Sequence, residues 1–217
     1  MEKSLFITFE GIEGCGKTTQ LSLAARWLET HGRNIRITRE PGGTEIGSRI
    51  RKILLSETTQ GLMPISEALL YMADRFQHIH DVIAPALVRG ETVLCDRYHD
   101  STVAYQGYAR GISLELLESI RTSGAMLDPD LTFLFDLDPQ MGLERSFKKL
   151  AAQQIDESRF EKETLEFHQR VREGFLVLLQ QNPERMIRID ASKSIDMVHG
   201  EITKILEERL KIYHEVK

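Results

Sequence analysis

The chain has 217 residues, of which 41% are hydrophobic and 28% are charged, a composition typical of one folded domain. It excludes a disordered or collagen-like chain, and the longest apolar runs, such as 175–179, are far shorter than the roughly 20 residues that a membrane-spanning helix needs. The 28 basic and 33 acidic residues give a net charge of −5, which argues against a large polyanion such as DNA as the main ligand. A small anion in a local basic pocket remains compatible with this charge.

The N-terminal segment and the cysteines indicate the compartment. The apolar run at 5–9 is too short for the core of a secretion signal, and no small-residue cleavage pattern follows it. Cys15 and Cys95 lie far apart and form no CxxC motif, so we expect two reduced thiols, without a disulfide framework or a zinc cluster. We therefore expect a cytoplasmic protein.

Short β-prone runs alternate with longer helical stretches along the chain. We predict strands at 5–9, 34–38, 92–95, 131–137 and 186–189. Several of them are apolar throughout, as expected for parallel strands that are covered by helices on both faces. Helices are predicted at 17–31, 45–55, 65–89, 113–123, 161–182 and 194–213. No internal repeat or Pro/Ser-rich linker divides the chain, so we predict one α/β domain over 1–217, a three-layer fold around a five-stranded parallel sheet.

Two helix starts and stops can be read from single residues. In the first helix, Leu21, Ala24, Ala25 and Leu28 make one apolar stripe, and Gly32 follows as a typical C-terminal stop. Asp138-Pro139 reads as an N-cap followed by proline at the first helical position, so another helix should begin directly after the fourth strand.

A glycine-rich motif lies between the first strand and the first helix. It satisfies G-x-x-x-x-G-K-[ST], the P-loop pattern, and a chance glycine-rich turn is the weaker alternative because the strand and helix stand where the mechanism needs them. Its backbone N–H groups and the helix N-terminus would hold phosphates, Lys17 would reach the outer phosphates and Thr18 would offer its hydroxyl to Mg²⁺. The predicted ATP-binding residues are Gly11, Ile12, Glu13, Gly14, Cys15, Gly16, Lys17, Thr18 and Thr19.

The same loop serves GTPase switches and other nucleotide-binding modules, which are the main alternative class. The sequence contains no Asp-x-x-Gly, and neither Asn34 nor Asn182 begins an Asn-Lys-x-Asp motif. A phosphoryl-transfer enzyme of the P-loop NTPase type fits better.

Asp96 and Arg97 follow the third predicted strand, at the sheet edge where α/β proteins bind ligands. A carboxylate for Mg²⁺ would then stand next to a guanidinium for phosphate. The alternative is an internal Asp–Arg ion pair, which is common at strand ends. Asp136, at the end of the fourth strand, is a competing but lower-ranked magnesium candidate.

Three further blocks, Glu-Pro-Gly-Gly-Thr at 40–44, Asp-Arg-Tyr at 96–98 and Ser-Thr-Val-Ala-Tyr-Gln-Gly at 101–107, follow the P-loop in this order. Together with that loop they resemble the bacterial thymidylate kinases, over nearly the whole chain from Phe6 to about Phe175. The resemblance implies an enzyme that transfers phosphate from ATP, with Mg²⁺, to dTMP. Another nucleoside monophosphate kinase is the nearest alternative, and a non-catalytic nucleotide-binding protein is a more distant one.

The resemblance also implies an acceptor site. Tyr71 would stack on thymine and Arg75 would bond its carbonyl oxygen; they are four apart and share a helix face, although a core tyrosine beside a solvated arginine is the plain alternative. Thr102 and Gln106 would meet the imide edge, and Tyr105 would lie near the sugar. Three further residues complete the implied set: Arg51 and Arg97, which would clamp the acceptor phosphate, and Glu40, which would organise the site through metal or water. Arg39 is a weaker phosphate candidate.

Glu13 stands where eukaryotic relatives carry a P-loop arginine, so the catalytic cation should come from elsewhere. Bacterial relatives supply it from a mobile lid, here at about 146–160. The candidates are Lys149 and Arg159, between which the sequence does not decide, whereas Lys148 reads as a solvated surface residue. The catalytic set is Lys17, Arg97, Asp96, Glu13, Lys149 and Arg159.

The remaining expectations concern assembly and the periphery of the site. The family usually forms homodimers through packed helices, and the apolar faces near 65–89 and 113–123 could serve. His78 and His80 should be structural or exposed, because two residues apart on a helix they face different ways. The loop at 190–193 is a positional guess for adenine contacts.

Overall fold

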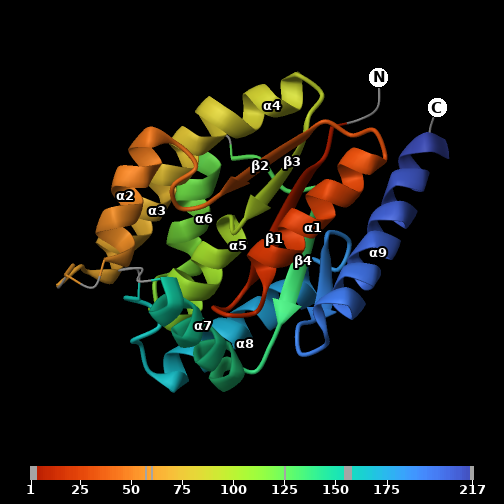
Figure 1. Ribbon diagram of the computed structural model, residues 1–217. Helices are drawn as coiled ribbons and strands as arrows, with labels where there is room; N and C mark the ends of the chain where they lie inside the picture. Colours follow the sequence, from red (N-terminus) through yellow and green to blue (C-terminus); the bar gives the residue numbers. More distant parts are fainter. Residues whose placement is uncertain (1–3, 57, 60, 125, 154–157, 216–217) are drawn as a thin grey trace.

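Five parallel strands form the central sheet of the computed structural model, which describes residues 4–56, 58–59, 61–124, 126–153 and 158–215 (Figure 1). The strands are β1 (Phe6–Gly11), β2 (Ile35–Arg39), β3 (Thr92–Asp96), β4 (Leu131–Asp136) and β5 (Met186–Asp190). Their order in the sheet is β2-β3-β1-β4-β5. All five lie within two residues of the predicted bounds, so the predicted α/β fold with a five-stranded parallel sheet is confirmed.

Helical segments connect the strands and cover the sheet. The α-helices are α1 (Lys17–Thr30), α2 (Glu45–Leu55), α3 (Pro64–His78), α4 (Ala84–Val88), α5 (His99–Thr102), α6 (Leu114–Ser123), α7 (Pro139–Gln153), α8 (Leu165–Gln181) and α9 (Ile195–Glu215). Two π-helical segments, η1 (Ile79–Ile83) and η2 (Val103–Ala109), continue α3 and α5. No helix in the described part of the chain is both long enough and apolar enough to span a membrane.

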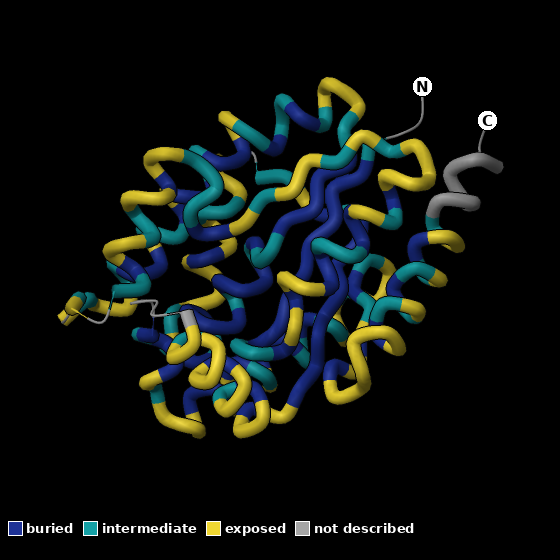
Figure 2. The backbone as a smooth tube through the Cα atoms, viewed as in Figure 1, coloured by how far each residue is buried: buried dark blue, intermediate teal, exposed yellow. Residues whose placement is uncertain are grey.

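The apolar strands are buried because both faces of the sheet are covered. Every residue of β1 is buried; Ile7 and Phe9 belong to the main core cluster with residues of α1, α8 and α9, whereas Phe6 packs with Val93 and Cys95 against η1 and α4. Figure 2 shows buried strands at the centre of the molecule; β1, β3 and β4 are almost entirely buried, whereas the edge strands β2 and β5 are partly exposed. An apolar run without alternation is therefore what this three-layer arrangement requires.

Several helix starts are explained by side-chain caps. The Oδ1 atom of Asp138 accepts hydrogen bonds from the backbone N–H groups of Gln140 (3.0 Å) and Met141 (3.3 Å), which confirms the predicted start of α7. Thr164 caps α8 by accepting from Phe167 N, so the helix predicted from 161 begins at Leu165 instead. Such caps satisfy N–H groups that have no partner within the helix.

Two helical predictions need correction. The stretch 65–89 is not one continuous α-helix, because its hydrogen-bond pattern changes to π-helical at η1. The helical segment formed by α5 and η2 was not predicted at all. The side chain of its N-cap residue, Tyr98, makes no capping hydrogen bond, and the segment includes Gly107, so its intrinsic helix propensity is weak. Packing of η2 against α8 stabilises it instead, and α8 reaches it closely through Gly174, where a Cβ would lie 2.8 Å from Tyr108.

Candidate active site

A cavity of about 400 Å³ opens at the carboxyl edge of the sheet. Its volume lies within the range of small-ligand sites. Most of the predicted site residues line it: Glu13, Gly14, Lys17, Thr18, Glu40, Arg51, Tyr71, Arg75, Asp96, Arg97, Thr102, Tyr105, Gln106 and Lys149. Among the described residues, the predicted ones that do not reach its wall are Gly11, Ile12, Cys15, Gly16, Thr19 and Arg159. Because parallel strands end at one edge, residues that are far apart in sequence meet there.

The P-loop has a backbone conformation that its glycines make accessible. Gly11, Gly14 and Gly16 have φ values of 137°, 67° and 90°, which side-chain-bearing residues rarely adopt. A Cβ at Gly14 would also collide with the carbonyl oxygen of Gly142 in α7. The loop therefore packs directly against the helix that begins the predicted lid.

Lys17 lies inside this loop, largely buried at 7% exposure. Its Nζ donates hydrogen bonds to the carbonyl oxygens of Ile12 (2.7 Å) and Gly11 (3.0 Å). The loop thus holds the ammonium group at the cavity wall, next to the N-terminus of α1, where an anion is favoured.

Thr18 and Asp96 meet across the sheet edge. The Thr18 hydroxyl donates a hydrogen bond of 2.5 Å to Oδ2 of Asp96, 78 residues away. Mg²⁺ takes oxygen ligands and keeps several waters and phosphate oxygens of its substrate, so one hydroxyl and one carboxylate suit it. Within the described residues no three His, Cys, Asp or Glu side chains gather into a metal cluster. By its chemistry, the oxygen pair of Thr18 and Asp96 fits a cation that also takes phosphate oxygens.

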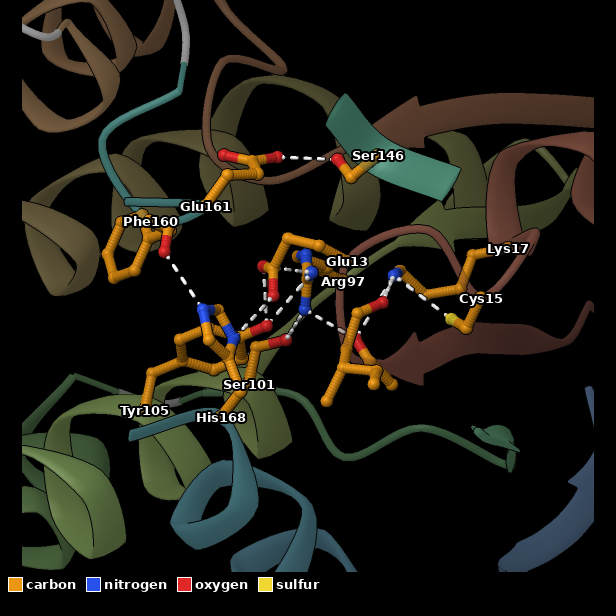
Figure 3. A network of polar contacts seen from close by, with 12 residues as sticks. Glu13, Cys15, Lys17, Arg97, Ser101, Tyr105, Ser146, Phe160, Glu161 and His168 are labelled. Atoms are coloured by element: carbon orange, nitrogen blue, oxygen red, sulfur yellow. Dashed lines mark hydrogen bonds and ion pairs between the residues drawn. The ribbon is translucent and has the colours of Figure 1, made fainter. Parts of the chain in front are cut away.

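Arg97 has a strained backbone and a fully engaged side chain. Its φ of 69° is the one positive value among the non-glycine residues that the structure describes. The guanidinium donates to Gly11 O (2.7 Å), Ser101 Oγ (3.1 Å) and Glu13 Oε1 (2.8 Å), as Figure 3 shows. It also lies over the ring of Tyr105. These contacts hold the guanidinium of Arg97, the residue that directly follows β3, against the P-loop.

Glu13 is the acidic partner in this network. Burial raises its pKa, but the Arg97 charge and His168 outweigh burial, so that the pKa lies well below the usual value. Its Oε1 accepts a 2.5 Å hydrogen bond from the Tyr105 hydroxyl, and its Oε2 lies 3.4 Å from Nδ1 of His168 (Figure 3). His168 Nε2 in turn contacts the Phe160 carbonyl oxygen at 3.0 Å. The P-loop is thereby connected to the base of the predicted lid.

The opposite side of the cavity contains a buried arginine. Arg75, 1% exposed, donates from Nε to Glu40 (2.7 Å), from Nη1 to Thr102 Oγ1 (2.9 Å) and from Nη2 to Tyr98 O (3.0 Å). The second carboxylate oxygen of Glu40 contacts His78 Nδ1 at 2.8 Å. Glu40 therefore positions Arg75 through a buried ion pair, a contact that the sequence did not predict.

Tyr71, Gln106 and Arg51 complete this side. Tyr71 lies one helical turn before Arg75 on α3, and both line the cavity, as their spacing predicts. Gln106 comes from η2, and Arg51 comes from α2, where its Nη1 donates to Pro41 O (3.0 Å). The cavity thus has a phosphate end at the P-loop and an aromatic, amide-bearing end between α3 and η2.

The two lid cations lie in different places. Lys149 in α7 lines the cavity. Arg159 is held away from it, donating from Nη2 to Glu67 (2.5 Å) and from Nη1 to the carbonyl oxygen of Leu54 (2.9 Å). Residues 154–157 of the expected lid lie outside the described part of the chain. The geometry thus favours Lys149 over Arg159 as the cation that faces the phosphates.

Asp136, the competing magnesium candidate, does not share the cavity. Its oxygens pair with Arg172 (2.6 Å) and Arg188 (2.5 Å) beside it. His78 is fully buried and forms hydrogen bonds with Glu40 and Thr38, whereas His80 is exposed. This confirms that the two histidines face different ways.

Both cysteines are free and buried.

The sequence reading missed four residues of these networks. They are Glu10, Glu67, Ser101 and His168. Ser101 lies within a recognised block, and Glu10 ends the apolar run of β1, which is a weak signal for a buried carboxylate. Nothing in the local sequence marks Glu67 or His168, because the side chains that they pair with, such as Gln106 and Glu13, are tens of residues away or more.

The comparisons with known proteins identify the family. A family model described as thymidylate kinase matches residues 9–202. The chain belongs to the thymidylate kinase family. It is 49% identical over 211 residues to the thymidylate kinase of Desulforapulum autotrophicum, covering 96% of this chain and 93% of that one. The thymidylate kinase of Deinococcus radiodurans is 47% identical, with 96% and 99% covered.

A solved structure of the thymidylate kinase family agrees with this assignment. The crystal structure of thymidylate kinase from Ehrlichia chaffeensis superposes with a TM-score of 0.76 at 38% sequence identity, covering 94% of this chain and 98% of that one. The thymidylate kinase family resemblance drawn from the sequence blocks is therefore confirmed.

Proposed function

We propose that this chain transfers the γ-phosphoryl group of ATP to the phosphate of dTMP, giving ADP and dTDP. The observation that carries the proposal is a single cavity with a P-loop lysine at one end and an aromatic ring and an amide at the other. One polyanion and one base-bearing monophosphate fit such a site end to end. The acceptor is already an anion, so positioning and charge neutralisation are needed rather than a strong general base.

At the donor end, the P-loop N–H groups and Lys17 hold the outer phosphates of ATP. The Thr18 hydroxyl and the Asp96 carboxylate would hold Mg²⁺, which when bound would neutralise phosphate charge. Arg97 stands beside them, and its ion pair with Glu13 keeps the guanidinium oriented before substrate arrives. Pre-oriented charge costs no rearrangement during the reaction.

At the acceptor end, Arg97 and Arg51 clamp the monophosphate, since a guanidinium matches two phosphate oxygens at once. Tyr71 stacks on thymine, Gln106 meets its imide edge, and Tyr105 stands near the sugar. Arg75 bonds a carbonyl oxygen of thymine; its guanidinium also donates a hydrogen bond to Thr102 and is held by Glu40.

The lid supplies the last cation. We assign that role to Lys149, because it shares the cavity with Lys17 and Arg97, whereas Arg159 is bound to Glu67. The lid at about 146–160 would close over the phosphates and exclude water.

We further infer a homodimer and a reducing compartment. Leu69 of α3 and Leu114 and Leu116 of α6 are 49%, 42% and 42% exposed, and α3 packs against α6. These exposed apolar side chains on two packed helices support a dimer interface over α3 and α6, which sedimentation of the purified chain would test. The free, buried thiols of Cys15 and Cys95 suit the cytoplasm.

A panel of acceptors tests the proposed function. Initial rates of ADP formation are measured with dTMP, dUMP, UMP, AMP and GMP at fixed ATP and Mg²⁺. We expect dTMP to have the highest kcat/KM. A preference for another acceptor would indicate a different nucleoside monophosphate kinase, and tight ATP binding without ADP formation would indicate a binding module.

A further inference from the structure

A buried carboxylate, Glu67, stands behind the base end of the cavity and takes no part in the phosphoryl transfer described above. It lies in α3 and is 1% exposed. It does not line the cavity in the part of the chain that the structure describes. Its oxygens nevertheless accept from three donor residues on two other segments, η2 with its C-cap and the base of the lid, so a packing role alone does not account for it.

The donors around Glu67 include two cations and one amide. Arg110 Nε lies 3.2 Å from Oε1, Arg159 Nη2 lies 2.5 Å from Oε2, and Gln106 Nε2 donates to Oε1 at 2.8 Å. The two guanidinium groups compensate the buried charge, which otherwise would be costly. The carboxylate is thereby held in one place between α3, η2 and the base of the lid.

This carboxylate decides which end of the Gln106 amide faces the cavity. An amide carries a two-hydrogen donor at one end and an acceptor oxygen at the other, whereas a carboxylate between two guanidinium groups only accepts. The nitrogen of Gln106 must therefore point to Glu67. The carbonyl oxygen is left as the group that Gln106, which lines the cavity, can offer to a bound base.

An acceptor at this position distinguishes pyrimidines by N3. Thymine and uracil carry an N–H at N3, whereas cytosine carries a lone pair there. A fixed carbonyl oxygen accepts a hydrogen bond from N3–H of thymine or uracil. With cytosine, the same oxygen would face the N3 lone pair, and two acceptors facing each other without a hydrogen are strongly disfavoured in a binding site.

We propose that Glu67 is a positioning residue that makes the acceptor site select pyrimidines with a hydrogen at N3, by fixing the orientation of the Gln106 amide. This rests on the proposed function, because it takes the base of dTMP to lie against Gln106. Arg159 contributes to the same positioning, because its guanidinium holds the Glu67 carboxylate from the lid side.

The test is the ratio of kcat/KM for dTMP to kcat/KM for 5-methyl-dCMP, which keeps the 5-methyl group and differs at N3 and C4. In Glu67→Gln the side chain at 67 can donate as well as accept, so Gln106 is free to turn. We expect the ratio to narrow by about tenfold or more. It stays above one, because Arg75 still favours a carbonyl oxygen at C4.

Two further variants separate positioning from general damage. Glu163→Gln removes the other carboxylate on Arg110, at 2.6 Å from its Nη2, and no contact joins Glu163 to Gln106 in the described structure; it should leave the ratio within about twofold of the parent. Gln106→Met removes the amide and should narrow the ratio by itself. Adding Glu67→Gln to it should then change the ratio no further.

The proposal is overturned if Glu67→Gln lowers both rates in proportion and leaves the ratio unchanged. If that variant does not fold, Gln106→Met decides alone, and an unchanged ratio overturns the proposal. Failure of the proposed function gives a different result, in which the unaltered chain itself shows no preference for dTMP.

Discussion

The two ends of the cavity are built by different means. At the phosphate end, a contiguous loop and the ends of β1 and β3 place backbone groups, Lys17 and Arg97, and glycine conformations set the geometry. At the base end, side chains hold one another across long separations, as Glu67 does with Gln106, 39 residues away, and with Arg159, 92 residues away. The glycine-rich loop is thus placed by local backbone, and β3 brings Asp96 and Arg97 to it from 78 to 86 residues away. In the proposed function, selection among nucleotides depends on the side-chain contacts of the base end.

The contrast has a consequence for mutations. Removing a charged group at the phosphate end removes interactions with the transferring group and should lower kcat. Changes at the base end should alter KM and acceptor preference, because they affect ground-state and transition-state binding alike.

The largest effect is expected for Arg97→Ala. The guanidinium contacts the P-loop and, in the proposed function, would face the transferring group; contacts of this kind are typically worth about 10³ to 10⁵ in rate. Steady-state kinetics should show kcat reduced by at least about 10³. Removing the guanidinium also leaves the Glu13 carboxylate without its ion-pair partner, so the unfolding temperature should fall, and rates are measured well below it on the folded variant. Arg97→Lys should recover only part of the loss. Near-normal turnover of folded Arg97→Ala would refute the role.

Lys149→Ala should have the next largest effect, lowering kcat by about 10² to 10³, the usual cost of one stabilising donor. Lys148→Ala is the matched control, since this neighbour is exposed and does not line the cavity. It should change kcat by less than about twofold. Single-turnover rates would compare the two variants. If both lower the rate equally, the assignment of the lid cation to Lys149 is wrong.

A pH effect on stability is expected from Glu10, beneath the phosphate end. Burial and then the Asp100 charge raise its pKa from 4.5 to about 7. Between these values the folded chain binds more protons than the unfolded chain, so the contribution is complete below pH 4.5 and is lost as the pH rises through about 7. This amounts to at most about 3 kcal/mol.

Urea unfolding of the parent chain and Glu10→Gln at pH 5, 6, 7 and 8 would measure this contribution. The free energy of unfolding of the parent should fall relative to that of the variant as the pH rises. A difference that stays constant over this range, or that changes in the opposite direction, would contradict the raised pKa.

Tyr71→Ala tests the base end and should have the smallest effect. Stacking of a base on an aromatic ring is worth about 1–3 kcal/mol, so KM for dTMP should rise by about tenfold or more while KM for ATP stays nearly constant. Tyr71→Phe keeps the ring and should stay within about threefold of the parent. An equal loss in both variants would assign the contribution to the hydroxyl instead.

Much of the fold was predictable because it depends on local patterns. Short β-prone runs, several of them apolar throughout, marked the five strands, and Asp138 marked the start of α7. The α5–η2 segment was missed because its stability comes from packing on α8 rather than from its own propensity. In the site, the P-loop was readable as one motif, whereas the buried pair of Glu40 and Arg75 was not, since 35 residues separate its members.

By itself, the sequence placed a glycine-lined loop between a buried strand and a helix and predicted that it binds phosphates, because spacing and residue type suffice when neighbours in the chain are neighbours in space. The tertiary structure decided that Lys149 rather than Arg159 faces the cavity, and that Glu67 meets Gln106. Both depend on which side chains the parallel sheet and its covering helices bring together, and a buried charge is tolerated only where such distant partners surround it.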